Sequence, residues 1–192
     1  MKINEIFYSL QGEGRLAGTP AVFVRFSGCN LACPFCDTDH KKGKQMSEED
    51  IVKEVSRYRC EWVVLTGGEP ALQVTENLID KLHKSGKKVA IETNGTKEIK
   101  GFPDWVTCSP KDKFCKKAQP ILKSCGEIKV VYNGAREVST YPYIYASYYY
   151  LQPCDTGDKK KNALILKKAV NFIKKHPKWV LSLQIQKILN IR

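Results

Sequence analysis

Five short polar motifs in this chain each follow an apolar segment rich in β-branched residues. These segments are typical of strands, and the stretches between several of them have the spacing of amphipathic helices. The strand-and-motif units are “AVFVRFSGCN” (21–30), “WVVLTGGEP” (62–70), “KVAIETNGT” (88–96), “DWVTCSPK” (104–111) and “YIYASYYYLQPCD” (143–155). Strands that alternate with helical crossovers form a parallel sheet, and the carboxyl ends of such strands meet at one edge. The five motifs are therefore expected to form one site.

The order of the segments predicts an α/β fold. A sixth strand is expected at “EIKVVYN” (127–133), and a terminal one at “WVLSLQIQ” (179–186). Helices are expected at 47–58, 72–85 and about 162–175. A complete TIM barrel needs eight strands and eight helices, whereas this pattern supplies about six main parallel strands and about three full helices. We therefore predict a partial, TIM-like barrel, built as a single domain over residues 1–192 because no repeat or linker divides the chain.

Composition limits the functions to be considered. The formal net charge of +12 permits nucleic-acid binding. The lysines fall mostly on predicted loops and helix surfaces, however, and no RNA- or DNA-binding motif accompanies them, so we expect solvated faces and no nucleic-acid partner. No apolar run reaches the length of a signal or membrane-spanning segment, which predicts a cytoplasmic location without membrane contact. In the cytoplasm the eight cysteines are expected as thiols or metal ligands.

Three of these cysteines, Cys29, Cys33 and Cys36, lie in a loop directly after the first of these strands. Their spacing allows three thiolates to converge on one inorganic centre. A structural zinc site would need a fourth ligand such as Cys60 and is usually built from paired C-x2-C units, which this loop lacks. A 4Fe–4S cluster held by three thiolates instead leaves one iron without a protein ligand. An open metal position is what a catalytic centre requires.

The C-x3-C-x2-C loop resembles the signature of the radical S-adenosylmethionine (SAM) superfamily, and “LTGGEP” (65–70) resembles its GGEP motif. The aromatic Phe35 before the third cysteine agrees with this resemblance. Two glycines let the backbone approach a ligand closely, and Pro70 keeps Glu69 out of the helical region. The resemblance implies that SAM chelates the open iron and that the reduced cluster cleaves SAM to a 5′-deoxyadenosyl radical.

A narrower resemblance concerns the substrate. “FYSLQGEG” (7–14), Arg25, “CDT” (36–38), “SPK” (109–111) and “LQPCD” (151–155) are similar to the 7-carboxy-7-deazaguanine synthases of the queuosine pathway over nearly the whole chain. This resemblance implies a homodimeric carbon–nitrogen lyase that converts 6-carboxy-5,6,7,8-tetrahydropterin to 7-carboxy-7-deazaguanine and releases ammonia. SAM is regenerated and Mg2+ assists. The cluster needs a one-electron donor, and an acidic flavodoxin or ferredoxin would suit the positive chain.

The resemblance also implies roles for individual residues. The pterin contacts would be Leu10, Gln11, Gly12, Arg25 and Thr66. The SAM contacts would be Phe35, Cys36, Asp37, Gly68, Ser109, Pro110, Lys111, Gln152, Pro153, Cys154 and Asp155. The cluster ligands would be Cys29, Cys33 and Cys36, and Thr38 would give Mg2+ a hydroxyl oxygen. Arg25 also fits on physical grounds, since a guanidinium pairs with a carboxylate through two parallel hydrogen bonds.

Some residues and functions stay open. Glu13 could accept hydrogen bonds from the guanidine-like edge of a pterin, and Glu92 could lie near the SAM ribose or be structural. Gln186 stands where relatives often carry histidine. Two other functions share part of the pattern. A glycyl-radical activase has the cysteine loop but need not have “LQGEG” or “CDT”, and a zinc-stabilised basic module would bind tRNA or DNA.

Overall fold

A computed structural model describes residues 1–36, 38–39, 42–134 and 137–192 of the chain. In these residues nine strands form one sheet with the order β3-β1-β2-β4-β5-β6-β7-β8-β9. The strands are β1 (Lys2–Leu10), β2 (Pro20–Phe26), β3 (Lys44–Gln45), β4 (Trp62–Gly67), β5 (Lys88–Thr93), β6 (Trp105–Cys108), β7 (Ser124–Tyr132), β8 (Tyr145–Pro153) and β9 (Trp179–Leu181). From β2 to β9 all neighbours are parallel, whereas β1 is antiparallel to both β2 and β3. Because β3 and β9 are its two edges, the sheet is an open, partial barrel, as predicted.

Local capping explains where the helices begin. The helices are α1 (Glu48–Val55), α2 (Glu76–Lys84), α3 (Lys159–Lys175) and the short α4 (Ile185–Leu189), with 3-10 turns at Gly14–Leu16 and Pro70–Leu72. Ser47 and Asp50 form a reciprocal capping box at the start of α1. The side chains of Thr75 and Asp158 accept backbone N–H bonds at the starts of α2 and α3.

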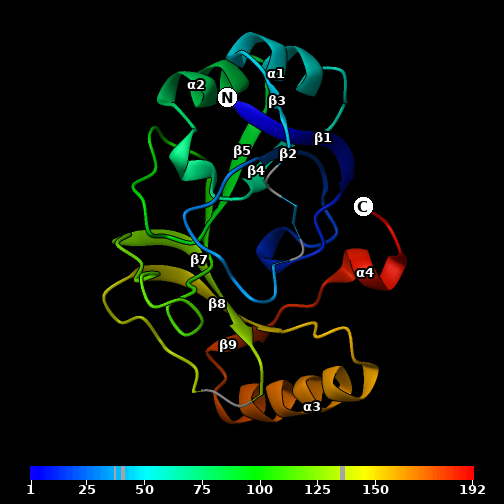
Figure 1. Cartoon of the computed structure of the whole chain (residues 1–192), viewed down its shortest axis with the longest axis vertical. Coiled ribbons are helices and arrows are strands. Elements are labelled where there is room, and N and C mark those ends of the chain that lie inside the picture. Colours follow the sequence, from blue (N-terminus) through cyan, green and yellow to red (C-terminus); the bar gives the residue numbers. More distant parts are fainter. Residues whose placement is uncertain (37, 40–41, 135–136) are drawn as a thin grey trace.

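The apolar residues of the strands divide between two faces. Val22, Val63 and Leu65 are buried in one cluster with α1 and α2, at one end of the molecule in Figure 1. At the other end, α3 packs on β8 and β9 through residues such as Ala169 and Trp179. The residues that alternate with the first set face inward and form a smaller cluster, in which Phe7 stacks on Phe23 with ring centroids 5.1 Å apart. The open inner face lies between the helices and holds the candidate site.

Several elements, the short strand β3 among them, differ from the sequence prediction. Strand β1 was not predicted, because its polar and half-buried residues obscure the alternation in “KINEIFYSL”. The helix expected at 72–85 begins only at Glu76, since Pro70 starts a separate 3-10 turn and Thr75 provides the cap. The strand expected at 179–186 ends at Leu181, where pairing with β8 ends, and the chain turns into α4. The amide of Ile185 then donates to the carbonyl of Gly12, 3.1 Å away, and fixes α4 beside β1.

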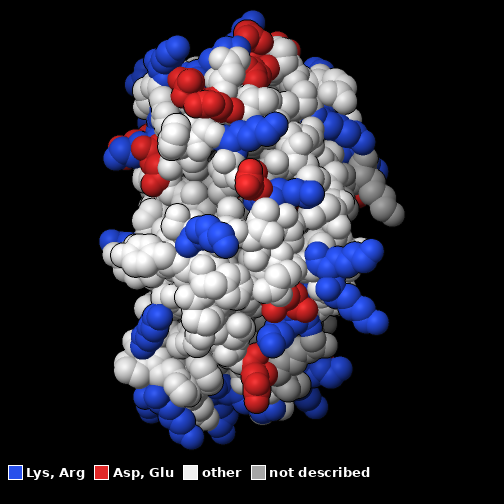
Figure 2. Space-filling model, turned by 90° about the vertical axis from the view of Figure 1, so that its left-hand side faces the viewer, with Lys and Arg blue, Asp and Glu red and all other residues white. Residues whose placement is uncertain are grey.

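Lysine and arginine side chains are spread over the face shown in Figure 2 and are interspersed with acidic ones. They are densest at the lower end, where α3 lies. Exposed lysines of this helix include Lys159, Lys160, Lys161, Lys167, Lys168, Lys174 and Lys175. In the part of the chain that the structure describes, no helix has both the length and the apolarity needed to cross a membrane.

Candidate active site

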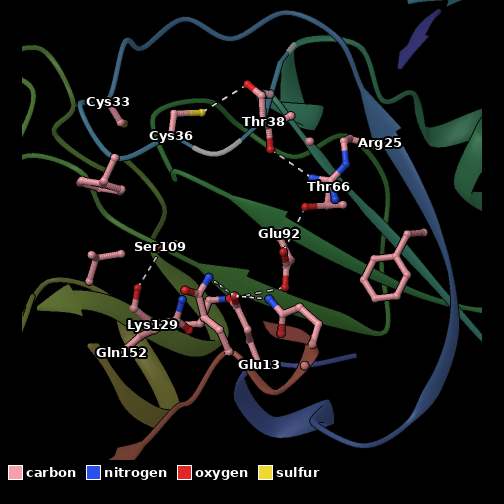
Figure 3. Close-up of a pocket in the computed structure, with 18 of the residues that line it drawn as sticks. Glu13, Arg25, Cys33, Cys36, Thr38, Thr66, Glu92, Ser109, Lys129 and Gln152 are labelled. Carbon is pink, nitrogen blue, oxygen red and sulfur yellow. Dashed lines mark hydrogen bonds and ion pairs between the residues drawn. The ribbon is translucent and has the colours of Figure 1, made fainter. Parts of the chain in front are cut away.

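A cavity of about 550 Å3 opens at the carboxyl ends of the parallel strands. All five motifs that follow the predicted strands contribute to its lining, through Cys29, Thr66, Asn94, Ser109 and Gln152 among others. The volume is in the range of small-molecule sites. In Figure 3 the cysteine loop lies on one side of the cavity, and Glu13 and Lys129 lie on the other. The expectation that these motifs meet at one edge is therefore confirmed.

The turn after β4 brings two loops into backbone contact. Gly67 has a φ of 114°, which favours glycine, and a Cβ added to Gly68 would lie 1.9 Å from the carbonyl oxygen of Gly28. The amide of Gly68 donates to Phe26 and the amide of Glu69 to Gly28, both at 2.9 Å. Both glycines are thus required where the GGEP turn meets the start of the cysteine loop.

Glu69 of the same turn is fully buried and has a structural role. Its carboxylate accepts from the Thr93 hydroxyl at 2.7 Å, the Asn94 amide at 2.7 Å and the Ala71 amide at 3.0 Å. Burial raises the pKa of Glu69, although these three donors oppose the rise. Its conformation is extended, as predicted from the following proline. Glu69 therefore ties the end of β4 to the end of β5 and shapes the cavity wall.

Replacing Glu69 by glutamine is expected to destabilise the fold by about 1–3 kcal/mol, because an amide nitrogen replaces an acceptor that faces backbone N–H donors. Urea denaturation of both proteins measures the difference. The exposed Glu98 offers a matched control, and Glu98→Gln should change the free energy of unfolding by less than about 0.5 kcal/mol. An equally small effect at Glu69 would contradict its structural role.

The thiols of Cys29, Cys33 and Cys36 all line the cavity. Burial raises the pKa of Cys29 and of Cys33. In the described residues no three His, Cys, Asp or Glu side chains are arranged to hold a metal ion, so cluster binding would require these thiols to converge. The donor chemistry fits an iron–sulfur cluster: three soft thiol ligands in one short loop, at the mouth of a cavity with room for a further ligand.

A buried ion cluster lies opposite the cysteine loop. The Lys129 ammonium lies 2.6 Å from a Glu13 carboxylate oxygen and 3.3 Å from one of Glu92. Gln11 and Thr66 also donate to the two oxygens of Glu92, at 3.1 and 3.0 Å. Burial lowers the pKa of Lys129, but the charges of the two carboxylates outweigh it and hold that pKa well above its usual range. One cation and two carboxylates thus face the cavity.

Glu13 is also held by the chain before and within α4. Gln184 and Gln186 donate to the same Glu13 oxygen at 3.0 and 3.1 Å. Burial raises the pKa of Glu13, but the charge and hydrogen bond of Lys129 and the two amides outweigh it, so that the pKa falls to about 2. The side-chain oxygen of Gln186 is buried and has no partner within the described residues. This oxygen lies against Gly12, where an added Cβ would be only 1.7 Å from it, so position 12 has no room for a side chain.

Arg25 lies on the third side of the cavity, near the end of β2. Its Nε donates to Glu5 at 2.9 Å and one terminal nitrogen donates to the Thr38 hydroxyl at 3.1 Å. The guanidinium groups of Arg25 and Arg192 both lie over the Phe7 ring, 5.6 and 5.1 Å from its centroid. Arg192 also pairs with Glu5. Two cations therefore stand over an aromatic ring and share one carboxylate partner.

The loops after β6 and β8 form the remaining wall. The Lys111 ammonium donates to the backbone and side-chain oxygens of Ser109, both at 2.6 Å, and burial lowers its pKa. Gln152 accepts from Ser182 at 3.0 Å. Asp155 pairs with Lys187 of α4 at 2.8 Å. The first contact holds the loop after β6, and the other two join the end of β8 to the C-terminal segment.

The structure brings most residues predicted for the site together. The predicted residues that line the cavity are Leu10, Gln11, Gly12, Arg25, Cys29, Cys33, Phe35, Cys36, Thr38, Thr66, Gly68, Ser109, Lys111, Gln152, Pro153, Cys154 and Asp155. Pro110 instead borders a small neighbouring pocket. Asp37 lies outside the described residues. Glu13, Glu92 and Gln186, which the sequence left open, also line the cavity.

The sequence analysis missed several lining residues, among them Lys129, Gln184 and Arg192. Lys129 had a detectable signal, because a lysine in the middle of a buried strand needs a partner. Gln184 and Arg192 had no such signal. Gln184 falls within the strand predicted at 179–186, and Arg192 lies in the segment after it. Their positions depend on the turn into α4.

Comparisons with known proteins identify the family of the chain. The model of the Radical SAM superfamily matches residues 23–109. The 7-carboxy-7-deazaguanine synthase of Bacteroides thetaiotaomicron is 50% identical over 191 residues, covering 100% of this chain and 98% of the relative. That of Burkholderia multivorans is 37% identical, with 98% of each chain covered. The crystal structure of QueE from Escherichia coli superimposes with a TM-score of 0.72 at 29% identity, over 96% and 93% of the two chains. The chain therefore belongs to the 7-carboxy-7-deazaguanine synthase family of the radical SAM superfamily.

Proposed function

We propose that this protein converts 6-carboxy-5,6,7,8-tetrahydropterin to 7-carboxy-7-deazaguanine and ammonia, with a 4Fe–4S cluster, regenerated SAM and Mg2+. The observation that carries this proposal is the single cavity in which the three-cysteine loop faces Glu13, Lys129 and Glu92 (Figure 3). Membership in the family selects this function over the glycyl-radical activase and over the zinc-stabilised module. The named relatives support the reaction class.

The cysteine loop and the neighbouring wall would hold the cluster and SAM. Cys29, Cys33 and Cys36 would supply the three thiolates, and the bound cluster would supply the electron for reductive cleavage of SAM. The proposed SAM contacts are Phe35, Cys36, Asp37, Gly68, Ser109, Pro110, Lys111, Gln152, Pro153, Cys154 and Asp155. Gly68 lines the cavity, and its lack of a side chain lets its turn pack against the Gly28 carbonyl beside the cysteine loop.

The opposite wall would bind the pterin. Its carboxylate would pair with Arg25, and its guanidine-like edge would donate to the carboxylates of Glu13 and Glu92. Gln186, which stands where relatives often carry histidine, would act through Glu13, to which its side-chain nitrogen donates at 3.1 Å. Leu10, Gln11, Gly12 and Thr66 complete the proposed contacts.

Arg25→Ala is expected to raise the KM for the pterin by about 10- to 100-fold, which is the range for loss of a charge-assisted hydrogen bond. SAM binding, followed by the change in the cluster's electron paramagnetic resonance spectrum, should remain unchanged. Arg57→Ala is a matched control, because Arg57 is exposed and pairs only with its helix neighbour Glu54 among the ion pairs described. Equal losses of pterin and SAM binding would contradict this assignment.

Thr38 is proposed as a hydroxyl ligand of Mg2+. Thr38→Ala should raise the Mg2+ concentration needed for half-maximal activity about tenfold, because a hard cation with few protein ligands is sensitive to the loss of one oxygen. Thr38→Ser keeps the hydroxyl and should restore the Mg2+ response. An unchanged response in the alanine variant would remove Thr38 from the site, and its bond to Arg25 would then be its main contact.

The whole proposal is tested by anaerobic reconstitution with iron and sulfide, followed by incubation with reductant, SAM, Mg2+ and the carboxytetrahydropterin. We expect iron–sulfur absorption, ammonia and a deazaguanine product. Stoichiometric zinc without this absorption would overturn the cluster, and deoxyadenosine without ammonia would overturn the substrate.

Further proposals concern the assembly and its surroundings. We propose that residues 1–192 form one domain and that the protein is a homodimer. We also propose a cytoplasmic location, which suits a chain whose eight cysteines are free thiols. An acidic flavodoxin or ferredoxin would reduce the cluster. Sedimentation measures the dimer, and a turnover rate that falls with salt would support an acidic donor.

A further inference from the structure

The loop after β6 packs directly against the cysteine loop. The Cys115 sulfur lies 3.8 Å from the Cys33 sulfur and 3.8 Å from the carbonyl oxygen of Ala32. The same two loops also meet through the rings of Phe35 and Phe114, which pack edge to face with their centroids 4.6 Å apart. Cys33 lines the cavity, whereas Cys115 lies outside its lining. Cys115 therefore approaches the predicted cluster ligand from behind, and the active site described above makes no use of it.

We propose that Cys33 and Cys115 form a reversible disulfide when the cluster-free protein meets a peroxide. Both thiols are partly exposed, so a small oxidant can reach them. The sulfurs need to close by about 2 Å from this contact to reach disulfide length. One S–S bond forms while two S–H bonds and the O–O bond break. The two thiols lose two electrons, and hydrogen peroxide takes them up with the protons as two molecules of water.

The other two cysteines of the loop, which could also pair with Cys33, have contacts of their own. The Cys29 sulfur accepts from the Leu31 amide at 3.4 Å, and the Cys36 thiol donates to the Thr38 carbonyl at 3.7 Å. Cys108 and Cys125 also contact one another, but Cys108 is fully buried and shielded from an oxidant. Among the described cysteines, the 33–115 pair combines sulfur contact with access on both sides.

The consequence rests on the proposed role of Cys33 in holding the cluster. A disulfide sulfur is not a thiolate, so cluster and disulfide exclude one another. Bound iron would protect Cys33, and loss of the cluster would expose it. The disulfide would keep Cys33 from oxidising further to a sulfinic acid, which thiols do not reduce. Cys115 thus preserves a cluster ligand until reducing conditions return.

The test compares the full-length protein, cluster-loaded and cluster-free, after one equivalent of hydrogen peroxide. Peptide mass spectrometry should find a 33–115 linkage in the cluster-free protein and not in the loaded one. Iron and sulfide uptake by the linked protein should fall to about one-tenth or less, and dithiothreitol should restore it. With two or more equivalents of peroxide, Cys33 in Cys115→Ser should pass the sulfenic acid, which dithiothreitol reduces, and reach the sulfinic acid, so that the lost uptake does not return with dithiothreitol. At the same dose the control Cys125→Ser should behave as the unmodified chain.

Linkage of Cys33 to Cys29 or Cys36, or no linkage, would overturn the inference, as would full recovery of Cys115→Ser. A reduced protein that takes up no cluster would instead count against the proposed function. The mass spectrum would still decide the linkage in that case.

Discussion

Replacing Cys33 by alanine is expected to abolish both cluster binding and activity. A cluster that already leaves one iron without a protein ligand has no thiolate to spare, and Cys33 is the central cysteine of the loop. Iron and sulfide analysis after anaerobic reconstitution should show no bound cluster, and the assay should yield no ammonia above background. Because a Cys-to-Ala change at a partly exposed loop position removes little packing, the far-ultraviolet circular dichroism should be unchanged.

Cys115→Ala is the matched control for this prediction. Its sulfur is only 3.8 Å from that of Cys33, yet it lies outside the cavity lining. Under strictly anaerobic conditions it should bind a full cluster and turn over normally. If Cys33→Ala keeps a cluster with SAM-dependent spectral changes, another residue must be the third ligand. If both variants lose the cluster, the contact between the two loops, and not the thiolate of Cys33, would be what the site needs.

Much of this architecture could be predicted from local patterns. A buried parallel strand is mostly apolar along its length, so “AVFVRF” and “WVVLTG” can be recognised as strands from the sequence. Glycines or prolines mark the turns that follow them. Parallel topology then fixes where the motifs go, since the carboxyl ends of all such strands face one edge. This rule predicts, without any side-chain contact, that Cys29, Thr66 and Ser109 lie close together. All three line the cavity.

The parts that were not predicted depend on tertiary contacts. β1 is recognisable only once β2 and β3 pair with it, because its own residues are mostly half-buried. “LQIQ” has the alternation of a strand, but within the described residues the pairing with β8 ends at Leu181. The bond from Ile185 to Gly12 accompanies the turn of the chain into α4. Gln184 and Gln186 reach Glu13 only because of that turn. The ion cluster therefore depends on a contact across almost the whole chain.

Lys129→Met is expected to reduce the free energy of unfolding by about 3–5 kcal/mol, because it leaves the Glu13 and Glu92 carboxylates facing a largely buried site without their cation. Methionine preserves most of the side-chain volume, so the loss is electrostatic. Lys123→Met is the control, because Lys123 directly precedes the same strand, β7, and is exposed. Its effect should stay within about 0.5 kcal/mol. Urea denaturation at pH 7 measures both. A small effect at Lys129 would mean that water or the amides compensate for the two carboxylates.

The pH dependence separates this electrostatic loss from a packing defect. In the unmodified chain the pKa of Glu13 is about 2, below its ordinary value, so its contribution to stability is present above that ordinary value and is lost as the pH falls towards 2. Without Lys129, burial is no longer outweighed and should raise the pKa of Glu13 above its ordinary value. The penalty is then greatest at neutral pH and shrinks as acid protonates the carboxyl. The stability difference should therefore be smaller at pH 4.5 than at pH 7, and Glu13→Gln in the Lys129→Met background should recover part of it. A difference independent of pH would assign the loss to packing, because a cavity left by a side chain does not titrate.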